Sequence, residues 1–534
     1  MTIKREQAIT ELLKIDIRTS ADLQQLKRKL AKKHQTTILR HSEILKAMEK
    51  IEDVDLAPGL RRLLRKRAVR TLSGIAPVAV LTKPWPCPGK CVYCPTEKNV
   101  PQSYLSNEPA VMRAIREGFD PYKQVQSRLR ALEANGHEPN KIELIVIGGT
   151  WSVLPVKYKY WFISNCFKAA NNFKSEIRNP KSETNSKFKK INSKPTLEQL
   201  KQQLLEEQKR NEKAKYKIIG ITLETRPDYI NEQELLQMRE LGCTRVEIGV
   251  QAIDDKILKK NKRGHDVAAI ASATKLLKDS GFKVTYHIMP GLPGSTPARD
   301  LIMFKRLFSD ERFQPDQIKF YPTVVTRGSL LYCWWKQGEY KPYSNAVLRK
   351  LIIECKKIVP PHIRIIRLIR DIPGDSIVAG NTITNLRQVL EQEGVKCDCI
   401  RCREIKDGKI NRYSFRVTRY SASAGAEYFI EAVGKDKRTL FGFCRLRLAK
   451  NNLWGAALIR ELHVYGELVS IGKNKIIQHA GIGKRLMKKA EELAQKNNFE
   501  KMAVISGVGA RGYYRKLDYH LEGSYMIKNL LKFK

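Results

Sequence analysis

The sequence predicts an α/β fold, in which a basic helical region precedes a parallel sheet or partial barrel and a smaller α+β domain follows it. The chain has 534 residues, and at about 150 residues per domain this length allows three or four domains. From about residue 76, short apolar segments alternate with helical ones. After about residue 390, a cysteine cluster and then alternating strands follow. We therefore expect regions at 1–75, 76–390, 391–410 and 411–534.

The chain carries a large surplus of positive charge. Lysine and arginine number 99 against 55 for aspartate and glutamate, a net charge of +44, and 42% of the residues are hydrophobic. This apolar fraction is sufficient for folded cores and excludes a disordered tail. The charge predicts a polyanionic partner, with nucleic acid ahead of an anionic membrane.

Apolar runs and cysteines indicate the compartment. No segment approaches the roughly 18 consecutive apolar residues of a membrane span, and the first residues have no signal-peptide pattern. The eleven cysteines are an odd number, which argues against a disulfide framework. We therefore expect no membrane partner, a reducing cytoplasmic compartment, and cysteine clusters that bind metal.

Region 1–75 has apolar residues at helical spacing, such as Ile9, Leu12 and Leu13. Its most basic run has six positive charges in ten positions: Arg61, Arg62, Arg65, Lys66, Arg67 and Arg70. Such a run can be a solvated helix face. The net charge of the whole chain favours phosphate binding instead, so we interpret the run as a nucleic-acid contact.

Region 76–390 alternates strands and helices as a parallel sheet requires. The expected strands are 78–81, 142–147, 218–223, 246–250, 284–288 and 318–321, with helices at 231–241 and 267–280. Residues 171–194, rich in Asn, Ser and Lys, interrupt the pattern, and we interpret them as a mobile basic insertion. In the last region, strands are expected at 427–433, 440–448, 456–464 and 502–506, with a helix from about 481.

The sharpest motif is Cys87-Pro-Gly-Lys-Cys91-Val-Tyr-Cys94, directly after the first expected strand. Three thiolates at this spacing can hold three irons of a [4Fe–4S] cluster and leave the fourth iron open for a ligand. Zinc would need a fourth protein ligand, and none is obvious nearby. An iron–sulfur site is therefore our interpretation, with structural zinc as the alternative.

This loop and Gly148-Gly149-Thr150, at the end of the second expected strand, together resemble the radical S-adenosylmethionine (SAM) superfamily. The resemblance implies a partial (βα)6-type barrel. It also implies a [4Fe–4S] cluster whose open iron binds SAM, and a SAM amino group that lies against Gly148, Gly149 and Thr150.

Five further segments resemble the catalytic subunit of the Elongator complex and its stand-alone archaeal and bacterial relatives. They are QSYLSNEPAVMRAI (102–115), LETRPD (223–228), RVEIGVQ (245–251), YHIMPGLPG (286–294) and DIPGDSIVAG (371–380). The resemblance runs from about residue 60 to the C-terminus, interrupted only by the insertion. It implies that four side chains contribute to cofactor binding: Glu224, Arg226, Glu247 and Gln251.

A second cysteine cluster, Cys397-Asp-Cys399-Ile-Arg-Cys402, lies between the two predicted domains. Three closely spaced thiolates favour a soft cation, and tetrahedral zinc needs one more ligand. His463 is the candidate by elimination, and Cys444 is the alternative, although a buried structural cysteine is its favoured role. The Elongator resemblance also implies zinc here, as a clamp between domains.

The expected helix near 481 begins with a glycine-rich turn: Gln478, His479, Ala480, Gly481, Ile482, Gly483 and Lys484. The Q-x-x-G-x-G pattern lets backbone N–H groups at a helix N-terminus bind a pyrophosphate. The segment resembles the GNAT acetyltransferases, which implies acetyl-CoA and catalytic contacts from Tyr513 and Tyr514. Ala480, Gly512 and Asp518 depart from the family pattern, so acetyl-CoA affinity or turnover could be reduced.

Together, these resemblances imply a tRNA acyltransferase, a carboxymethyluridine synthase that uses a SAM-derived radical and acetyl-CoA. It would form 5-carboxymethyluridine in the anticodon, with the tRNA anticodon stem-loop held by the basic region. Other classes stay open: a protein lysine acetyltransferase with a structural iron–sulfur domain, another radical SAM enzyme such as a methylthiotransferase, or a tRNA-binding scaffold. Other Elongator-type subunits are not required, and a homodimer is left open.

We expect the remaining isolated cysteines, and His287, to have structural roles. Cys166, Cys243, Cys333 and Cys355 are expected to be buried small apolar groups. His287 is expected to be a hydrogen-bonded core residue.

Overall fold

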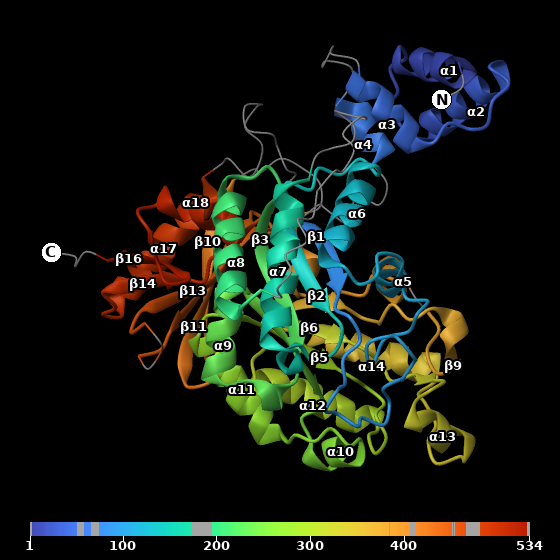
Figure 1. Ribbon diagram of the computed structural model, residues 1–534. Helices are drawn as coiled ribbons and strands as arrows, with labels where there is room; N and C mark the ends of the chain where they lie inside the picture. The colour runs from blue at the N-terminus through green and yellow to red at the C-terminus, as the bar shows by residue number, and fades with distance from the viewer. Residues whose placement is uncertain are drawn as a thin grey trace.

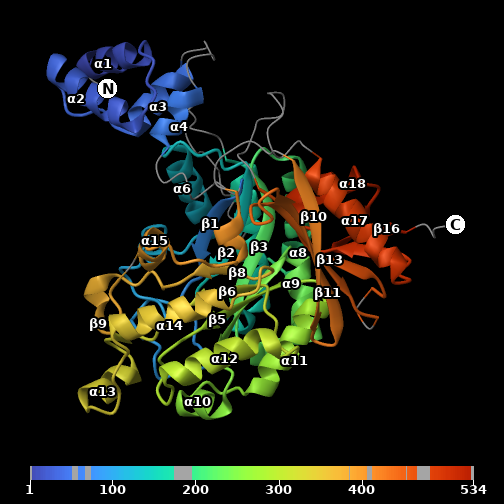
Figure 2. The same cartoon turned by 180° about the vertical axis from the view of Figure 1, so that it is seen from behind.

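The computed structural model describes residues 3–50, 58–65, 74–173, 195–383, 385–405, 412–450, 452, 454–465 and 481–530. It consists of a small helical lobe, a central barrel-like domain and a C-terminal sheet domain (Figures 1 and 2). Within these residues, no helix is both long and apolar enough to span a bilayer. All eleven cysteines are free thiols.

The N-terminal lobe is helical, as the sequence predicts. Its helices are α1 (Ile3–Leu13), α2 (Ser20–Lys33), α3 (His41–Lys50) and α4 (Pro58–Leu64). Thr19 and Asp22 form a capping box at the start of α2, which satisfies backbone N–H groups that the first turn leaves free. Leu12, Leu30 and Ile44 are buried in a core of the lobe's own. The lobe projects from one end of the molecule (Figure 1) and meets the central domain at the turn after α6, where a Cβ on Gly136 would lie 3.2 Å from Leu45 of α3.

The central domain is built on a seven-stranded parallel sheet, and this confirms the predicted barrel-like architecture. Its strands are β1 (Ala76–Leu81), β2 (Lys141–Ile147), β3 (Lys217–Thr225), β4 (Arg245–Gln251), β5 (Lys283–Ile288), β6 (Gln317–Phe320) and β8 (Arg364–Arg367). They pair in the order of the chain, each parallel to its neighbour. β4 is buried on both faces, as a strand covered by helices must be.

Helices connect the strands and cover the sheet. They are α5 (Pro109–Arg116), α6 (Pro121–Glu133), α7 (Val156–Asn171), α8 (Leu197–Lys213), α9 (Glu232–Glu240), α10 (Asp255–Lys260), α11 (Val267–Asp279), α12 (Pro297–Ser309), α13 (Leu330–Lys336), α14 (Asn345–Lys357) and α15 (Leu386–Gln392). Short strands β7 (Val325–Thr326) and β9 (Ile377–Ala379) form a separate ladder. Most of the predicted insertion, residues 174–194, lies outside the described residues.

The C-terminal domain has one seven-stranded sheet and few helices. Its strands are β10 (Tyr413–Ala422), β11 (Gly425–Gly434), β12 (Leu440–Leu448), β13 (Ala457–Val464), β14 (Lys501–Val504), β15 (His520–Glu522) and β16 (Tyr525–Asn529), and its helices are α16 (Ile400–Arg403), α17 (Ile482–Lys496) and α18 (Arg511–Arg515). Among the described strands of this sheet, β13 and β14 are the pair that runs in parallel, over Ala457–Ile459. β13 continues to Val464 beyond that pairing, beside the start of α17.

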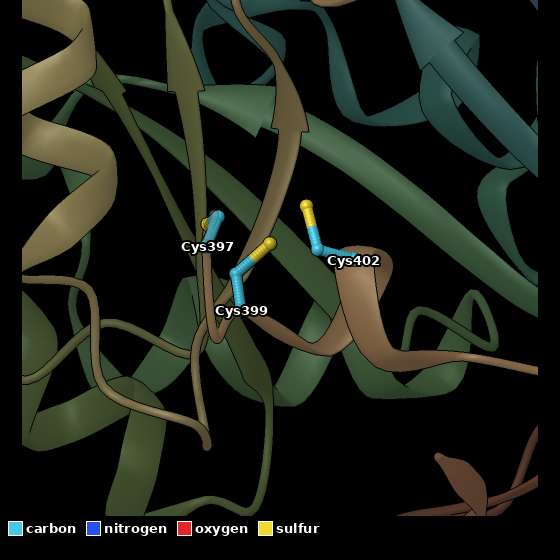
Figure 3. Close-up of side chains that lie close together, drawn as sticks. All are labelled: Cys397, Cys399 and Cys402. Atoms are coloured by element: carbon cyan, nitrogen blue, oxygen red, sulfur yellow. The ribbon is translucent and has the colours of Figure 1, made fainter. Parts of the chain in front are cut away.

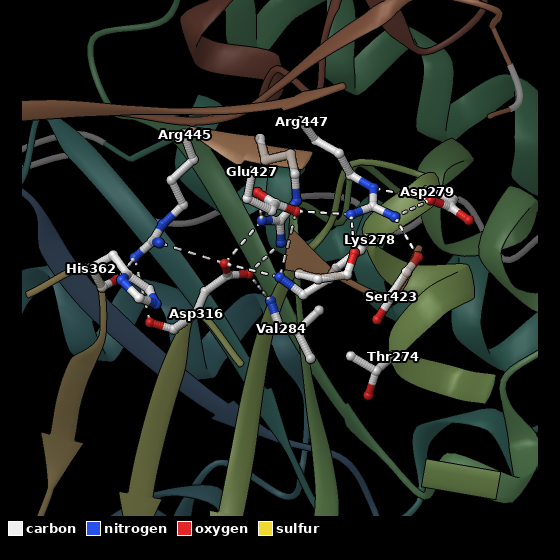
Figure 4. A network of polar contacts seen from close by, with 12 residues as sticks. Thr274, Lys278, Asp279, Val284, Asp316, His362, Ser423, Glu427, Arg445 and Arg447 are labelled. Carbon is white, nitrogen blue, oxygen red and sulfur yellow. Dashed lines mark hydrogen bonds and ion pairs between the residues drawn. The ribbon is translucent and has the colours of Figure 1, made fainter. Parts of the chain in front are cut away.

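The C-terminal domain docks against the amino-terminal ends of the barrel strands. Arg460 donates to Asp316 (2.9 Å), which precedes β6, and Arg447 donates to Asp279 (3.0 Å), the last residue of α11. Glu427 of β11 accepts from both arginines. Figure 4 shows this buried network between the two sheets. The barrel's carboxyl ends, where βα loops gather, therefore face away from the C-terminal sheet.

Candidate functional site

The Cys87–Cys94 loop follows β1 and lies at the carboxyl ends of the barrel strands. Cys87 Sγ is 3.8 Å from Thr150 Oγ1 and accepts from the Gly89 backbone N–H at 3.4 Å. Thr150 follows β2, so the parallel register brings the loop and the second strand end together. Active sites in barrels of this kind form at this edge.

Arginines make the loop electropositive. Arg263 Nη1 lies 3.1 Å from Cys91 Sγ. The hydrogen bond from Cys94 and the charges of Arg263 and Arg226 lower the pKa of Cys91 to about 5, against the opposing effect of burial. A thiolate is the form that binds iron, so Cys91 is ready for this role at neutral pH. Arg263 lies in the basic run Lys262–Arg263, which the sequence offers no way to distinguish from ordinary surface charge.

The strand end at Gly148 and Gly149 requires glycine. Their φ angles are +134° and +95°, in a region that side chains with a Cβ rarely occupy. A Cβ on Gly148 would lie 2.2 Å from Thr82 Oγ1. This turn sets the backbone beside the cysteine loop, where the radical SAM resemblance predicts the SAM amino group.

The other predicted cofactor residues lie in different parts of the barrel. Arg226 follows β3, donates to the Arg263 carbonyl at 2.7 Å and has a buried Nη1 close to Gly89. Glu224 accepts from Tyr104 OH at 2.9 Å. Glu247 instead lies in the barrel interior, where His287 bonds to it at 2.9 Å and Lys319 contacts it. Burial raises the pKa of Glu247, but Lys319 and His287 hold it well below its usual value.

Several buried polar atoms at this end of the barrel have no protein partner in the described part of the chain. They include Arg226 Nη1, Gln251 Oε1 and Thr82 Oγ1. Gln251 also has a φ of +67°, an uncommon backbone conformation that occurs mainly at special sites. A buried polar atom left without a partner is costly. These atoms therefore suit a polar ligand that approaches the cysteine loop, as SAM would.

The second cysteine cluster is compact. Cys397, Cys399 and Cys402 point toward one another at the start of α16 (Figure 3). Hydrogen bonds from Cys397 and Cys402 lower the pKa of Cys399 well below its usual value. One thiolate supported by two thiols is the donor set that a soft cation such as zinc binds.

His463, the predicted fourth ligand, is not brought to this cluster. It faces Phe443 across the β12–β13 pairing, and its ring stacks at 5.9 Å on Phe443 and lies 4.3 Å from Tyr465. The strand pairing, which the sequence does not reveal, turns the ring into an aromatic cluster. Cys444 is fully buried, as its structural interpretation predicts. Among the isolated cysteines, Cys166, Cys243 and Cys355 are buried, whereas Cys333 is exposed and that expectation is wrong.

The glycine-rich turn and Tyr513 meet at the start of α17. Gly481 is the N-cap, with a φ of +73°. A Cβ on Gly483 would lie 2.7 Å from the Tyr513 hydroxyl, so Gly483 leaves room for that group. Burial raises the pKa of Tyr513 to about 12, and the hydroxyl keeps its proton at neutral pH. Backbone N–H groups and one hydroxyl thus converge at a helix N-terminus, which favours anions.

Tyr514 differs from its neighbour. It is 7% exposed and belongs to the core of the C-terminal domain, whereas Tyr513 is 40% exposed. Of the other predicted residues, Gln478, His479, Ala480, Lys66, Arg67 and Arg70 lie outside the described residues. Arg61 and Arg62 lie on α4, and Arg65 follows it.

Family models match three parts of the chain. The Radical SAM superfamily matches residues 87–305, the Radical SAM C-terminal domain matches 315–395, and the Acetyltransferase (GNAT) family matches 408–519. The first begins at Cys87, and the last covers the Gly481 turn and Tyr513. Both domain resemblances predicted from motifs are thereby confirmed.

Known proteins match nearly the whole chain. A tRNA uridine(34) acetyltransferase of Dehalococcoides mccartyi is 43% identical, covering 87% of this chain and all of that protein. Elongator complex protein 3 of Bos taurus is 38% identical, covering 91% of each. The solved structure of Methanocaldococcus infernus Elp3 with an N-terminal deletion aligns with a TM-score of 0.71 and 38% identity, over 86% of this chain and all of that one. The chain therefore belongs to the Elp3 family of tRNA uridine(34) acetyltransferases, with radical SAM and GNAT domains.

Proposed function

We propose that this protein uses SAM and acetyl-CoA to convert the wobble uridine of a tRNA into 5-carboxymethyluridine. The observation that carries the proposal is the presence of two sites in one chain. One is the cysteine loop with Arg263 beside Cys91, and the other is the glycine-rich N-terminus of α17 beside Tyr513. The names of the full-length relatives support tRNA uridine 34 as the target.

The cysteine loop would hold a [4Fe–4S] cluster through Cys87, Cys91 and Cys94. When bound, the cluster and SAM supply a carbon radical that abstracts hydrogen from an unactivated C–H bond. The hydrogen bond from Cys94 and the charge of Arg263 keep the pKa of Cys91 low, and Gly148 and Gly149 would leave space for the amino acid part of SAM. Arg226, with its buried Nη1, would donate to a carboxylate or sulfur that enters the loop.

The C-terminal domain would bind acetyl-CoA. Backbone N–H groups of Gly481, Ile482 and Gly483 would hold the pyrophosphate. Tyr513, protonated at neutral pH, would donate its hydroxyl proton to the thioester carbonyl or the pantetheine arm. Tyr514 would support Tyr513, since their rings pack edge to face at 5.3 Å.

The barrel separates these two sites. The C-terminal domain contacts β3 at Ile219, near its start, while Arg226 at its end approaches the cysteine loop. At about 3.3 Å per residue, this stretch of strand spans roughly 23 Å. Hydrogen abstraction from the acetyl group therefore requires the acetyl group to reach the cysteine loop, and an isotope label shows whether that abstraction takes place.

The helical lobe would supply the tRNA contacts. Six basic residues on and beside α4 would neutralise phosphates of the anticodon stem-loop: Arg61, Arg62, Arg65, Lys66, Arg67 and Arg70. Recognition of the tRNA would rest mainly on its shape and backbone charge. Zinc at Cys397, Cys399 and Cys402 would hold the linker between the domains without a part in the chemistry.

The decisive experiment uses acetyl-CoA labelled as CD3-acetyl. Protein with a reconstituted cluster is incubated without oxygen with dithionite, SAM, the labelled acetyl-CoA and tRNA, and the tRNA nucleosides are analysed by mass spectrometry. Hydrogen abstraction predicts carboxymethyluridine with two deuterium atoms and deuterium in 5′-deoxyadenosine. Transfer of an intact acetyl group to the tRNA or to a protein lysine keeps all three deuterium atoms and would replace the proposal with a simple acetyltransferase.

A matched variant separates binding from chemistry. Cys91→Ala should abolish formation of 5′-deoxyadenosine and leave the tRNA dissociation constant within a few fold. If tRNA binding were lost as well, the loop would have a mainly structural role.

A further inference from the structure

The helix that carries Tyr513 is too short to be stable alone. α18 has five residues, Arg511–Arg515, and follows a single 3-10 turn at Val508–Ala510. Isolated helices of this length do not form in water. Its position must therefore come from the surfaces that it contacts.

The segment that leads into α18 packs directly against the barrel domain. A Cβ on Gly507 would lie 2.0 Å from the Ile219 carbonyl oxygen, and one on Gly509 would lie 2.6 Å from Lys217 Cβ. The φ of Gly507 is −70°, which any residue can adopt, so glycine is needed here for space. The backbone of the C-terminal domain thus touches the start of β3.

A carboxylate of the barrel domain contacts α18 from the side. Glu212, near the end of α8, accepts from Arg511 Nη1 at 3.2 Å and from Arg515 Nη1 at 2.5 Å. The Glu212 and Arg511 side chains are 13% and 5% exposed. Figure 1 shows α18 beside the upper end of α8. Charge-assisted hydrogen bonds in such a setting are stronger than those between neutral groups.

Helix geometry links this contact to Tyr513. Arg511 and Arg515 are four residues apart and lie on one face of the helix. Tyr513, two residues from each, points about 200° away from Arg511 at 100° per residue. When Glu212 fixes the arginine face, it also fixes the direction of Tyr513, whose hydroxyl lies against Gly483.

We propose that Glu212 of the radical SAM domain is a positioning residue for the acetyl-CoA site, acting through Arg511 and Arg515 on Tyr513. The inference rests on the proposed function, because it takes the Gly483–Tyr513 site to be the place where acetyl-CoA binds. It also means that the C-terminal domain alone has an incompletely ordered site.

The test compares Glu212→Gln with Glu206→Gln, an exposed glutamate on the same helix, in full-length protein. Isothermal titration with acetyl-CoA should show affinity roughly tenfold weaker for Glu212→Gln and within twofold of the parent for Glu206→Gln. Formation of 5′-deoxyadenosine from SAM without acetyl-CoA should stay within twofold in both. The double variant Glu212→Gln, Arg515→Gln should bind no more weakly than Glu212→Gln alone, since both act through one contact.

Each outcome has a clear meaning. Equal acetyl-CoA affinity in the two single variants, or a parallel loss of SAM cleavage, would overturn the positioning role. If Glu212→Gln does not fold, Arg515→Gln alone, at a partly exposed arginine (44%), must show the weakened binding, or the inference fails. Absence of acetyl-CoA binding in the parent protein would instead refute the proposed function.

Discussion

Asp316 is the most informative residue at which to perturb the contact between the two domains. Its side chain is fully buried, accepts from the Val284 backbone N–H (2.8 Å) and from Arg460 (2.9 Å), and lies 3.7 Å from Lys278. Asp316→Asn keeps the shape of the side chain and an acceptor for Val284. It removes one negative charge from a group of buried cations from both domains (Figure 4).

The expected loss follows from burial. Removal of one partner from a buried ion pair leaves an uncompensated charge and costs about 3–5 kcal/mol. Asp310→Asn is the matched control, because Asp310 pairs with Arg306 and Arg312 at partly exposed positions. A pair of that kind is worth about 1 kcal/mol or less.

Urea unfolding at pH 7, followed by circular dichroism, measures both variants against the parent. We expect Asp316→Asn to lower the free energy of unfolding by several kcal/mol and Asp310→Asn by about 1 kcal/mol or less. Equal losses would show that the network does not hold the domains together, and the reasoning from burial would be refuted.

The pH dependence provides a second check. Burial raises the pKa of Asp316, but Arg460, Lys278 and Arg445 hold it far below its usual value. Stability from a carboxylate with a lowered pKa is fully present above its unfolded value, about 4, and is lost as pH falls through the folded value. The difference between the parent and Asp316→Asn should therefore not shrink as pH falls from 8 to 5. Burial lowers the pKa of the neighbouring Lys278 to about 8, and loss of the Asp316 charge lowers it further, which enlarges the difference as pH falls. A difference that shrinks in this window would mean that Asp316 takes up a proton there.

Three other predictions concern single sites. Elemental analysis should detect zinc in the parent and lose it in Cys402→Ser, while formation of 5′-deoxyadenosine stays within about twofold; unchanged zinc content would place the ion elsewhere. Gly148→Ala places a Cβ at 2.2 Å from Thr82 Oγ1 at a φ of +134°, so SAM affinity in anaerobic equilibrium dialysis should fall by roughly tenfold or more, and full affinity would exclude this turn from the SAM site. Combined Arg65→Glu and Arg67→Glu should weaken tRNA binding and reduce the slope of log K against log salt by about 1–2; an unchanged slope would move the tRNA contact away from α4.

The hydrophobic pattern of the sequence is sufficient to predict the principal strands of the barrel. Segment 246–250 lies within β4, which is buried on both faces and therefore appears as a continuous apolar run. Segment 142–147 lies within β2, whose residues alternate between buried and partly exposed but are still mostly apolar. β8 and β10 were missed. β8 is only Arg364–Arg367, with two charged residues, and β10 has polar residues on an exposed face, so neither has the apolar run that marks a central strand.

The candidate site was predictable where a ligand dictates spacing along the chain. Three cysteines in one loop, or a glycine-rich turn before a helix, bind their ligand through residues that are neighbours in the chain. Such a motif can be recognised from the sequence alone. Arg263 and Glu212 have no such signal. Each acts across more than one hundred residues of sequence on a group that only folding brings near.

The fourth zinc ligand shows the same limit. Elimination among the ligand-type residues predicts His463, but the β12–β13 pairing directs it into an aromatic cluster with Phe443 and Tyr465. The sequence alone determined which chemistry this protein can support, because thiolate loops and glycine turns are local. Only the tertiary structure decided that the two sites lie at opposite ends of one barrel and that buried charges join the domains, since those contacts form between residues far apart in the chain.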